Sequence, residues 1–180
     1  AYNNPGCKNL KLTQKQVAAI FLGDIKTWDQ LKCGKGAIKV AHRSDGSGTT
    51  FAFTNSLSSF SADWKKRVGE GKSVNWPVGV GGKGNEGVAG VLSNTPGSIG
   101  YLSQSFVRGA IKAAAIQNKE GKFVLPGLKS GASALNSIRL DANLAGEDPN
   151  PAGAQSYPIT TLTWILAYAV SPRPCRSEPG

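Results

Sequence analysis

Short strand-like stretches alternate with helical patterns along most of this chain, and glycine marks the passage from each strand to the next helix. Residues 37–42 (AIKVAH) favour a strand, a Gly/Ser turn follows, and Phe53, Leu57 and Phe60 then recur at helical spacing. Residues 73–97 repeat this order, since a strand passes there through glycines into a helix. Such alternation is typical of proteins whose helices pack on a sheet. The sequence therefore predicts an α/β fold with a central mixed or largely parallel sheet flanked by helices.

The best-marked helix lies in residues 12–23 (LTQKQVAAIFLG). Thr13 followed three residues later by Gln16 forms a capping-box pattern, and Gly23 is a typical helix stop. Further helices are expected in residues 61–69 and 133–146, and further strands in residues 98–103, 111–116 and 157–170.

The chain carries a strong positive charge, with 21 Lys and Arg against 11 Asp and Glu and a formal net charge of +10. The resulting field favours anionic ligands, but the basic residues are scattered along the chain, so a solvated basic surface is the preferred explanation of the charge. Nucleic acid is not the expected partner, because the tryptophans are not interleaved with basic clusters. The longest apolar run, residues 164–170, is a candidate buried strand and is far shorter than the roughly 20 residues of a membrane helix.

Cysteine and histidine are too sparse to suggest a metal site. Cys7, Cys33 and Cys175 have no C-x-x-C spacing, and His42 is the only histidine, so neither a zinc site nor another cofactor is expected. Cys7 precedes the first helix and Cys33 follows it, so these two could pair in an oxidising compartment and leave Cys175 unpaired. Three free thiols are the alternative.

The stretch AHRSDGSGTTFAF, residues 41–53, carries the chemistry of the chain. With Ser47 as N-cap, the following helix presents the unpaired backbone N–H groups of Gly48, Thr49 and Thr50 at the positive end of its dipole. The hydroxyls of Ser47 and Thr49 add donors, and Arg43 offers a planar cationic fork. Asp45 would hold that fork in place. Because an ordinary helix cap needs fewer donors, an anion site is preferred over a capped helix with an exposed ion pair.

Two catalytic or nucleotide motifs fail on inspection. The esterase elbow G-x-S-x-G would need glycine where Asp45 stands. Residues 79–84 (GVGGKG) match G-x-G-x-x-G, but no acidic residue follows about 20 positions later, and Lys83 is not followed by Ser or Thr as in a P-loop. A tight turn into a helix is the better interpretation, with Lys83 adding to a positive rim.

Four consecutive blocks then reveal a resemblance: IFLGDIKTWDQL, HRSDGSGTTFAFTNSLS, WKKRVGEGKSVNWPVGVGGKGNEGVAG and TPGSIGYLS. In this order and spacing they resemble the PstS-type phosphate-binding proteins of bacterial ABC importers. The resemblance implies one lobe of a type II periplasmic-binding-protein fold, in residues 1–170, followed by an extended tail in residues 171–180. It also implies that Arg43, Ser47, Gly48 and Thr49 bind phosphate, with Asp45 supporting Arg43.

The resemblance further implies a non-enzymatic role in phosphate transport. Inorganic phosphate is the expected ligand, without cofactor or nucleic acid, and a permease in the inner membrane is the expected partner. The location would be periplasmic or extracellular, with a membrane anchor of the full-length protein left open. The resemblance also implies that this is the second of two lobes, since AYNNPG matches the point where the family chain enters that lobe, and that the first lobe is missing here. The alternative is a half-length structural or interaction module that keeps the fold but has little affinity for the ligand.

Overall fold

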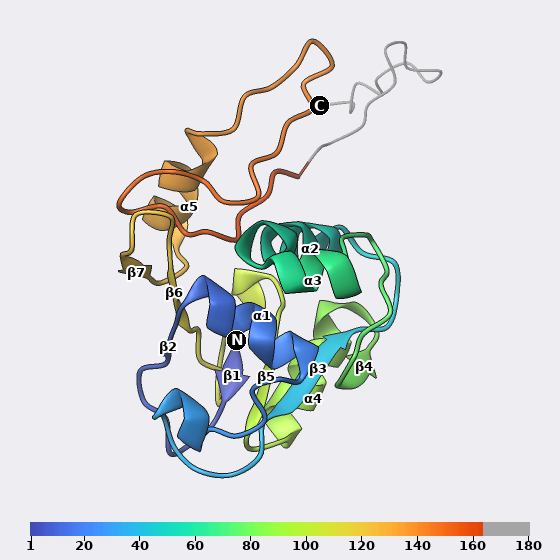
Figure 1. The fold of residues 1–180 in the computed structure, drawn as a ribbon, viewed down its shortest axis with the longest axis vertical. Coiled ribbons are helices and arrows are strands. Elements are labelled where there is room, and N and C mark those ends of the chain that lie inside the picture. The colour runs from blue at the N-terminus through green and yellow to red at the C-terminus, as the bar shows by residue number, and fades with distance from the viewer. Residues whose placement is uncertain (164–180) are drawn as a thin grey trace, which may run out of the picture.

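A mixed four-stranded sheet lies at the centre of the computed structural model, which describes residues 1–163 (Figure 1). Its strand order is β1-β5-β3-β4, with β3 parallel to both neighbours and β1 antiparallel to β5. Because β3, β4 and β5 run in the same direction, their carboxyl ends meet at one edge of the sheet. The strands are β1 (Tyr2–Asn3), β3 (Lys39–Arg43), β4 (Val80–Gly82) and β5 (Ser98–Gly100).

A second, smaller sheet has the order β2-β6-β7. Its strands are β2 (Lys11–Leu12), β6 (Ala115–Gln117) and β7 (Phe123–Val124). β2 and β6 run parallel, whereas β6 and β7 are antiparallel. The expected single central sheet is therefore accompanied by a short second one.

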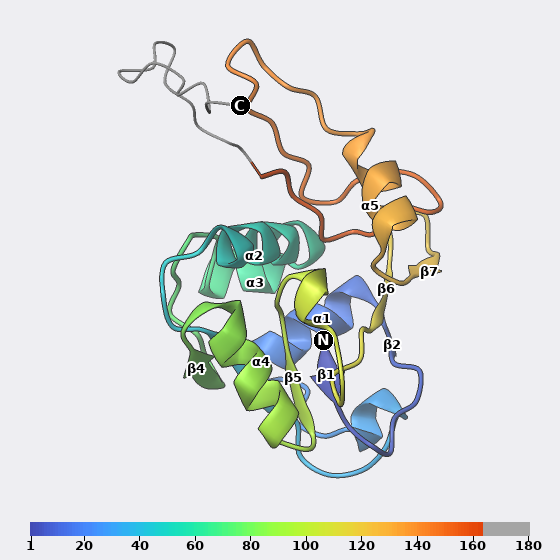
Figure 2. The same ribbon diagram turned by 180° about the vertical axis from the view of Figure 1, so that it is seen from behind.

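Helices cover both faces of the larger sheet. α1 lies in front of it in Figure 1 and α4 lies on the opposite face in Figure 2. The larger core, around Phe21, Phe53 and Trp64, fills the side of α1, α2 and α3, and the smaller core joins Val88 and Leu92 of α4 to the sheet. The helices are α1 (Gln14–Leu22), α2 (Gly48–Phe60), α3 (Ala62–Arg67), α4 (Gly84–Asn94) and α5 (Leu128–Leu135), with 3-10 turns η1 (Asp29–Leu31) and η2 (Gln104–Phe106).

Both ends of α1 agree with the sequence prediction. The Thr13 side chain accepts a hydrogen bond from the Gln16 N–H, and the Gln16 side chain accepts one from the Thr13 N–H at 2.9 Å. Gly23 follows with φ +78°, in the left-handed region that favours glycine. The helix predicted in residues 61–69 is also present as α3, with Ser61 as its cap.

The glycines before α4 serve close packing. A Cβ on Gly82 of β4 would lie 2.5 Å from the backbone of Gly87 and Val88, and a Cβ on Gly87 would lie 2.9 Å from the backbone of Gly82. β4 and α4 can approach this closely only because both positions are glycine. A strand is expected to precede the glycines, but β4 (Val80–Gly82) itself contains Gly81 and Gly82.

The helix predicted in residues 133–146 is wrong in its bounds, because α5 begins at Leu128 and ends at Leu135. After it, the Asp141 side chain accepts hydrogen bonds from the N–H groups of Asn143 and Ala145 at 2.8 and 2.9 Å. Such local bonds compete with helical ones, so the apolar spacing does not continue the helix.

The strand expected in residues 157–170 is absent from residues 157–163, where the Thr160 hydroxyl donates to the Tyr157 carbonyl at 3.0 Å. Residues 164–170, and the tail in residues 171–180, lie outside the described residues. Of the strand expected in residues 111–116, only the last two residues belong to β6.

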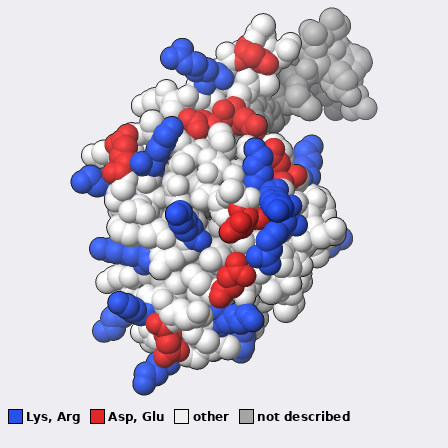
Figure 3. All heavy atoms as spheres, in the orientation of Figure 1, with Lys and Arg blue, Asp and Glu red and all other residues white. Residues whose placement is uncertain are grey.

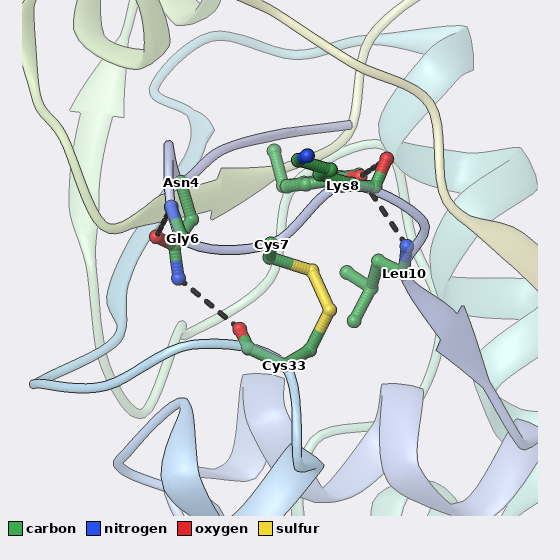
Figure 4. Close-up of a disulfide and its surroundings, with 7 residues drawn as sticks. Asn4, Gly6, Cys7, Lys8, Leu10 and Cys33 are labelled. Atoms are coloured by element: carbon green, nitrogen blue, oxygen red, sulfur yellow. Dashed lines mark hydrogen bonds between the residues drawn. A yellow bond between two sulfur atoms is a disulfide. The ribbon is translucent and has the colours of Figure 1, made fainter.

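A disulfide joins Cys7 to Cys33, with their Cα atoms 4.8 Å apart (Figure 4). The Asn4 side chain donates to the Cys33 carbonyl at 3.3 Å beside it. The bond connects the segment before α1 with the segment after η1, so the pairing considered from the sequence is confirmed. Among the helices described, none is long and apolar enough to cross a membrane.

Candidate functional site

The candidate site lies where β3 ends and α2 begins. Arg43 is the last residue of β3, and Ser47 is the N-cap of α2 only four residues later. The carboxyl ends of β4 and β5 lie at the same edge, because both strands are parallel to β3. In open α/β sheets this edge is where ligands bind.

Arg43 and Asp45 form a bidentate ion pair. The Arg43 Nε and Nη2 atoms donate to the two Asp45 carboxylate oxygens at 2.7 and 2.6 Å. The Arg43 side chain is 10% exposed and that of Asp45 is 32% exposed. The pairing expected from the sequence is therefore present, and it fixes the plane of the guanidinium group. Within residues 1–163, Nη1 of Arg43 has no protein partner.

Asp45 also contacts the start of α4. Its Oδ1 atom accepts a hydrogen bond from the Gly84 N–H at 3.1 Å. The bond to Arg43 and this backbone bond hold the pKa of the Asp45 carboxyl far below its usual range, while the bond to Asp45 raises the pKa of Arg43. The pair is ionised throughout the physiological range.

Ser47 caps α2 as the sequence predicts, but the free donors differ from the expectation. The Ser47 Oγ accepts the N–H groups of Thr49 and Thr50 at 3.0 and 3.3 Å, so these two are not unpaired. The Ser47 N–H is also engaged, since it donates to the Lys72 carbonyl at 2.8 Å. In the described part of the chain the Gly48 N–H has no acceptor. A helix end alone would leave the Thr49 and Thr50 N–H groups without acceptors, but the Ser47 side chain accepts both.

Most of these residues contribute to the wall of a pocket of about 1500 Å³. Arg43, Ser47, Gly48 and Thr49 all belong to its wall, whereas Asp45 and Lys83 do not. The predicted contribution of Lys83 to a positive rim is thus not seen in this pocket. The wall continues over the apolar side chains of α1, α2 and α5, including Phe21, Phe51, Leu128 and Leu135. Lys72 also lines the pocket, although the sequence analysis did not predict it as a site residue.

Tyr101 is a site neighbour that the sequence analysis did not single out. Its hydroxyl accepts the Arg43 N–H at 3.1 Å and lies 2.7 Å from the Thr50 Oγ1. Tyr101 directly follows β5, so its place beside Arg43 depends on the order of the strands. Residues 58 positions apart carry no local signal of such a contact.

His42 is not placed for catalysis with Ser47. Its ring stacks on Trp76, with the ring centroids 5.0 Å apart, and its Nδ1 lies 3.1 Å from the Arg43 carbonyl oxygen. No hydrogen bond connects His42 with Ser47 in the described residues.

Figure 3 shows Lys and Arg scattered among Asp and Glu over the face in view. No group of three or more His, Cys, Asp or Glu side chains suited to a metal ion occurs among residues 1–163.

The fold is a mixed α/β lobe of the type II periplasmic-binding-protein class. The chain belongs to the PBP superfamily, since the family model described as a PBP superfamily domain matches residues 1–174. It resembles the phosphate-binding protein PstS of Pasteurella multocida (strain Pm70), with 42% identity over 177 residues that cover 92% of this chain and 52% of the relative. PstS of Haemophilus influenzae (strain ATCC 51907 / DSM 11121 / KW20 / Rd) is likewise 42% identical, over 92% of this chain and 53% of the relative.

Solved structures show the same fold at lower sequence identity. A DING protein superposes with a TM-score of 0.66 at 22% identity, covering 88% of this chain and 53% of the other. The periplasmic phosphate-binding protein PfluDING, solved with bound phosphate, gives a TM-score of 0.61 at 23% identity over 78% of this chain and 43% of the other. The chain thus spans about half the length of the curated relatives it matches.

Proposed function

We propose that this chain binds inorganic phosphate, as a lobe of the solute-binding component of an ABC phosphate importer. The observation that carries the proposal is the convergence of Arg43 with Ser47, Gly48 and Thr49 at the start of α2, on the wall of one pocket. The 42% identity to two proteins named phosphate-binding protein PstS supports phosphate as the anion.

The proposed binding mode uses donors that the protein itself leaves open. Arg43 turns Nε and Nη2 to Asp45, so Nη1 is available for a phosphate oxygen. The Gly48 N–H and the hydroxyl hydrogens of Ser47 and Thr49 complete the set. A helix N-terminus adds partial positive charge to these bonds, and charge-assisted bonds of this kind are the stronger ones. Binding is non-enzymatic and uses no metal.

The proposed location is periplasmic or extracellular. The Cys7–Cys33 disulfide supports this, because disulfides persist in oxidising compartments. A permease in the inner membrane is the proposed partner, and a second lobe, corresponding to the other half of the relatives, would supply the remaining phosphate donors. PfluDING, a protein of known structure with the same fold, is a periplasmic phosphate-binding protein.

Phosphate titration of the full chain and two arginine variants tests this proposal. Arg43→Ala should weaken binding by about 1.5–3 kcal/mol, the range for hydrogen bonds to charged groups. Arg67→Ala is the matched control, because Arg67 also pairs with an aspartate, Asp24 at 3.3 Å, but on the exposed surface. This control should bind phosphate as the unsubstituted chain does.

Calorimetry at low salt provides the measurement. Equal phosphate affinity in the Arg43→Ala and unsubstituted chains would contradict the binding mode. Absence of phosphate binding by the unsubstituted chain would favour a structural or interaction module instead. Binding of nucleic acid that weakens steeply with added salt would point to a different class of partner.

A further inference from the structure

The ring of Tyr101 is held rigidly at the strand end. Only 6% of the residue is exposed, and the ring stacks on Phe53 of α2 with centroids 4.4 Å apart and an interplanar angle of 12°. Trp76 covers it at a centroid distance of 5.6 Å, and Phe21 of α1 lies 6.1 Å away. Contacts on several sides leave the ring one orientation, which directs its hydroxyl toward β3 and α2.

The hydroxyl connects the two halves of the anion site. It accepts the N–H of Arg43 at 3.1 Å and lies 2.7 Å from the Thr50 hydroxyl in the first turn of α2. β5 ends at Gly100, so the side chain of Tyr101 provides the acceptor that a continued strand would have offered the Arg43 N–H. One buried group thus fixes the end of β3 relative to the start of α2.

We propose that the Tyr101 hydroxyl is a positioning group for anion binding, which sets the Arg43 backbone at the correct distance from the Gly48 and Thr49 donors. The inference rests on the proposed phosphate function and assigns no ligand contact to Tyr101. Small displacements of a donor weaken a hydrogen bond steeply, so a group that fixes two donor elements together controls affinity without touching the anion.

Tyr101→Phe removes this hydroxyl and keeps the ring that packs on Phe53. Tyr2→Phe is the matched control, because the Tyr2 hydroxyl is also buried between backbone groups, accepting the Leu10 N–H at 3.3 Å and donating to the Lys8 carbonyl at 3.2 Å. The two partners of the Tyr2 hydroxyl lie in the segment that contains Cys7, and Tyr2 does not line the pocket of the candidate site. Both variants lose one tyrosine hydroxyl with two partners, so their effects on thermal stability should be similar.

Three measurements on the full chain distinguish positioning from stability: phosphate affinity, the amide proton shift of Arg43 in the free protein, and the melting temperature. Tyr101→Phe should weaken phosphate binding about three- to tenfold, as expected for loss of one neutral hydrogen bond, and should move the Arg43 amide proton upfield. Tyr2→Phe should leave both unchanged. Thr50→Val removes the hydroxyl that contacts the Tyr101 hydroxyl. The double variant should lose less phosphate affinity than the sum of the two single variants.

Two results would overturn the inference while the unsubstituted chain still binds phosphate. One is unchanged affinity in Tyr101→Phe, and the other is an equal loss of affinity in Tyr2→Phe. If the unsubstituted chain itself fails to bind phosphate, the proposed function falls and the inference falls with it. The unsubstituted sample therefore identifies which of the two has failed.

Discussion

Arg43, the last residue of β3, provides the positive charge of the candidate site, and Asp45 fixes the orientation of its guanidinium group. Its carboxylate accepts two bonds from Arg43 and one from the Gly84 N–H, so it joins β3 to the start of α4. A carboxylate beside an anion site lowers the local positive charge. Its contribution is to orient Arg43, whose fork would otherwise rotate.

Asp45→Asn should lower thermal stability at pH 7, and the difference should shrink in acid. An unfolded aspartate titrates near pH 4, whereas the Arg43 and Gly84 bonds keep the pKa of the folded carboxyl well below that. As pH falls below about 4 the unfolded chain takes up the proton first, so the wild type loses this stabilisation and the variant does not. Thermal melts from pH 7 to pH 3 measure this, and a gap that widens in acid would contradict it.

Local residues of the site are predictable from the sequence, and distant ones are not. The Arg43–Asp45 pair and the Ser47 cap lie within five positions, where side-chain chemistry and helix-end physics decide the contacts. The Ser47 side chain also accepts the Thr49 and Thr50 N–H groups, which the sequence analysis had expected to be unpaired. Tyr101 reaches the site only through the parallel pairing of β3 and β5, which no local pattern specifies.

Among the elements, the close contact of β4 with α4 offers a clear test. Gly82→Ala should destabilise the fold by at least about 2 kcal/mol, because its Cβ would lie 2.5 Å from the backbone of Gly87 and Val88. Gly90 lies in α4, and a Cβ there would have no atom within 4 Å. Gly90→Ala should therefore stabilise the fold by about 0.5–1 kcal/mol. Urea unfolding of both variants measures the contrast. Equal stability of the two would show that the close contact has no energetic role.

Elements with signals at both ends follow from the sequence, whereas the shortest strands do not. α1 has a capping box and a terminal glycine, so its bounds are local properties. β1, β2 and β7 have two residues each and exist only through their partners, so no alternation could reveal them. α5 shows the opposite failure, because apolar spacing after Leu135 suggested a helix that the Asp141 turn replaces.

For the molecule as a whole, the proposed donors approach the anion from one side only. All of them come from the end of β3 and the start of α2. A site closed from both sides excludes water and strengthens each charged bond by lowering the local dielectric. A one-sided site leaves the anion in contact with solvent, so this chain alone should bind phosphate weakly and discriminate poorly against sulfate.

The most direct test of the account is an NMR titration of the ¹⁵N-labelled full chain with inorganic phosphate at low salt, repeated with sulfate. The open Gly48 amide should shift, and the Thr49 amide and the Arg43 Nε–H, which neighbour the proposed contacts while bonded to Ser47 and Asp45, should shift and saturate with it. The dissociation constant should be roughly millimolar, which corresponds to about −4 kcal/mol, and sulfate should give similar shifts. Saturable shifts elsewhere with these three signals unmoved would contradict the site, and micromolar binding that rejects sulfate would contradict its one-sided character.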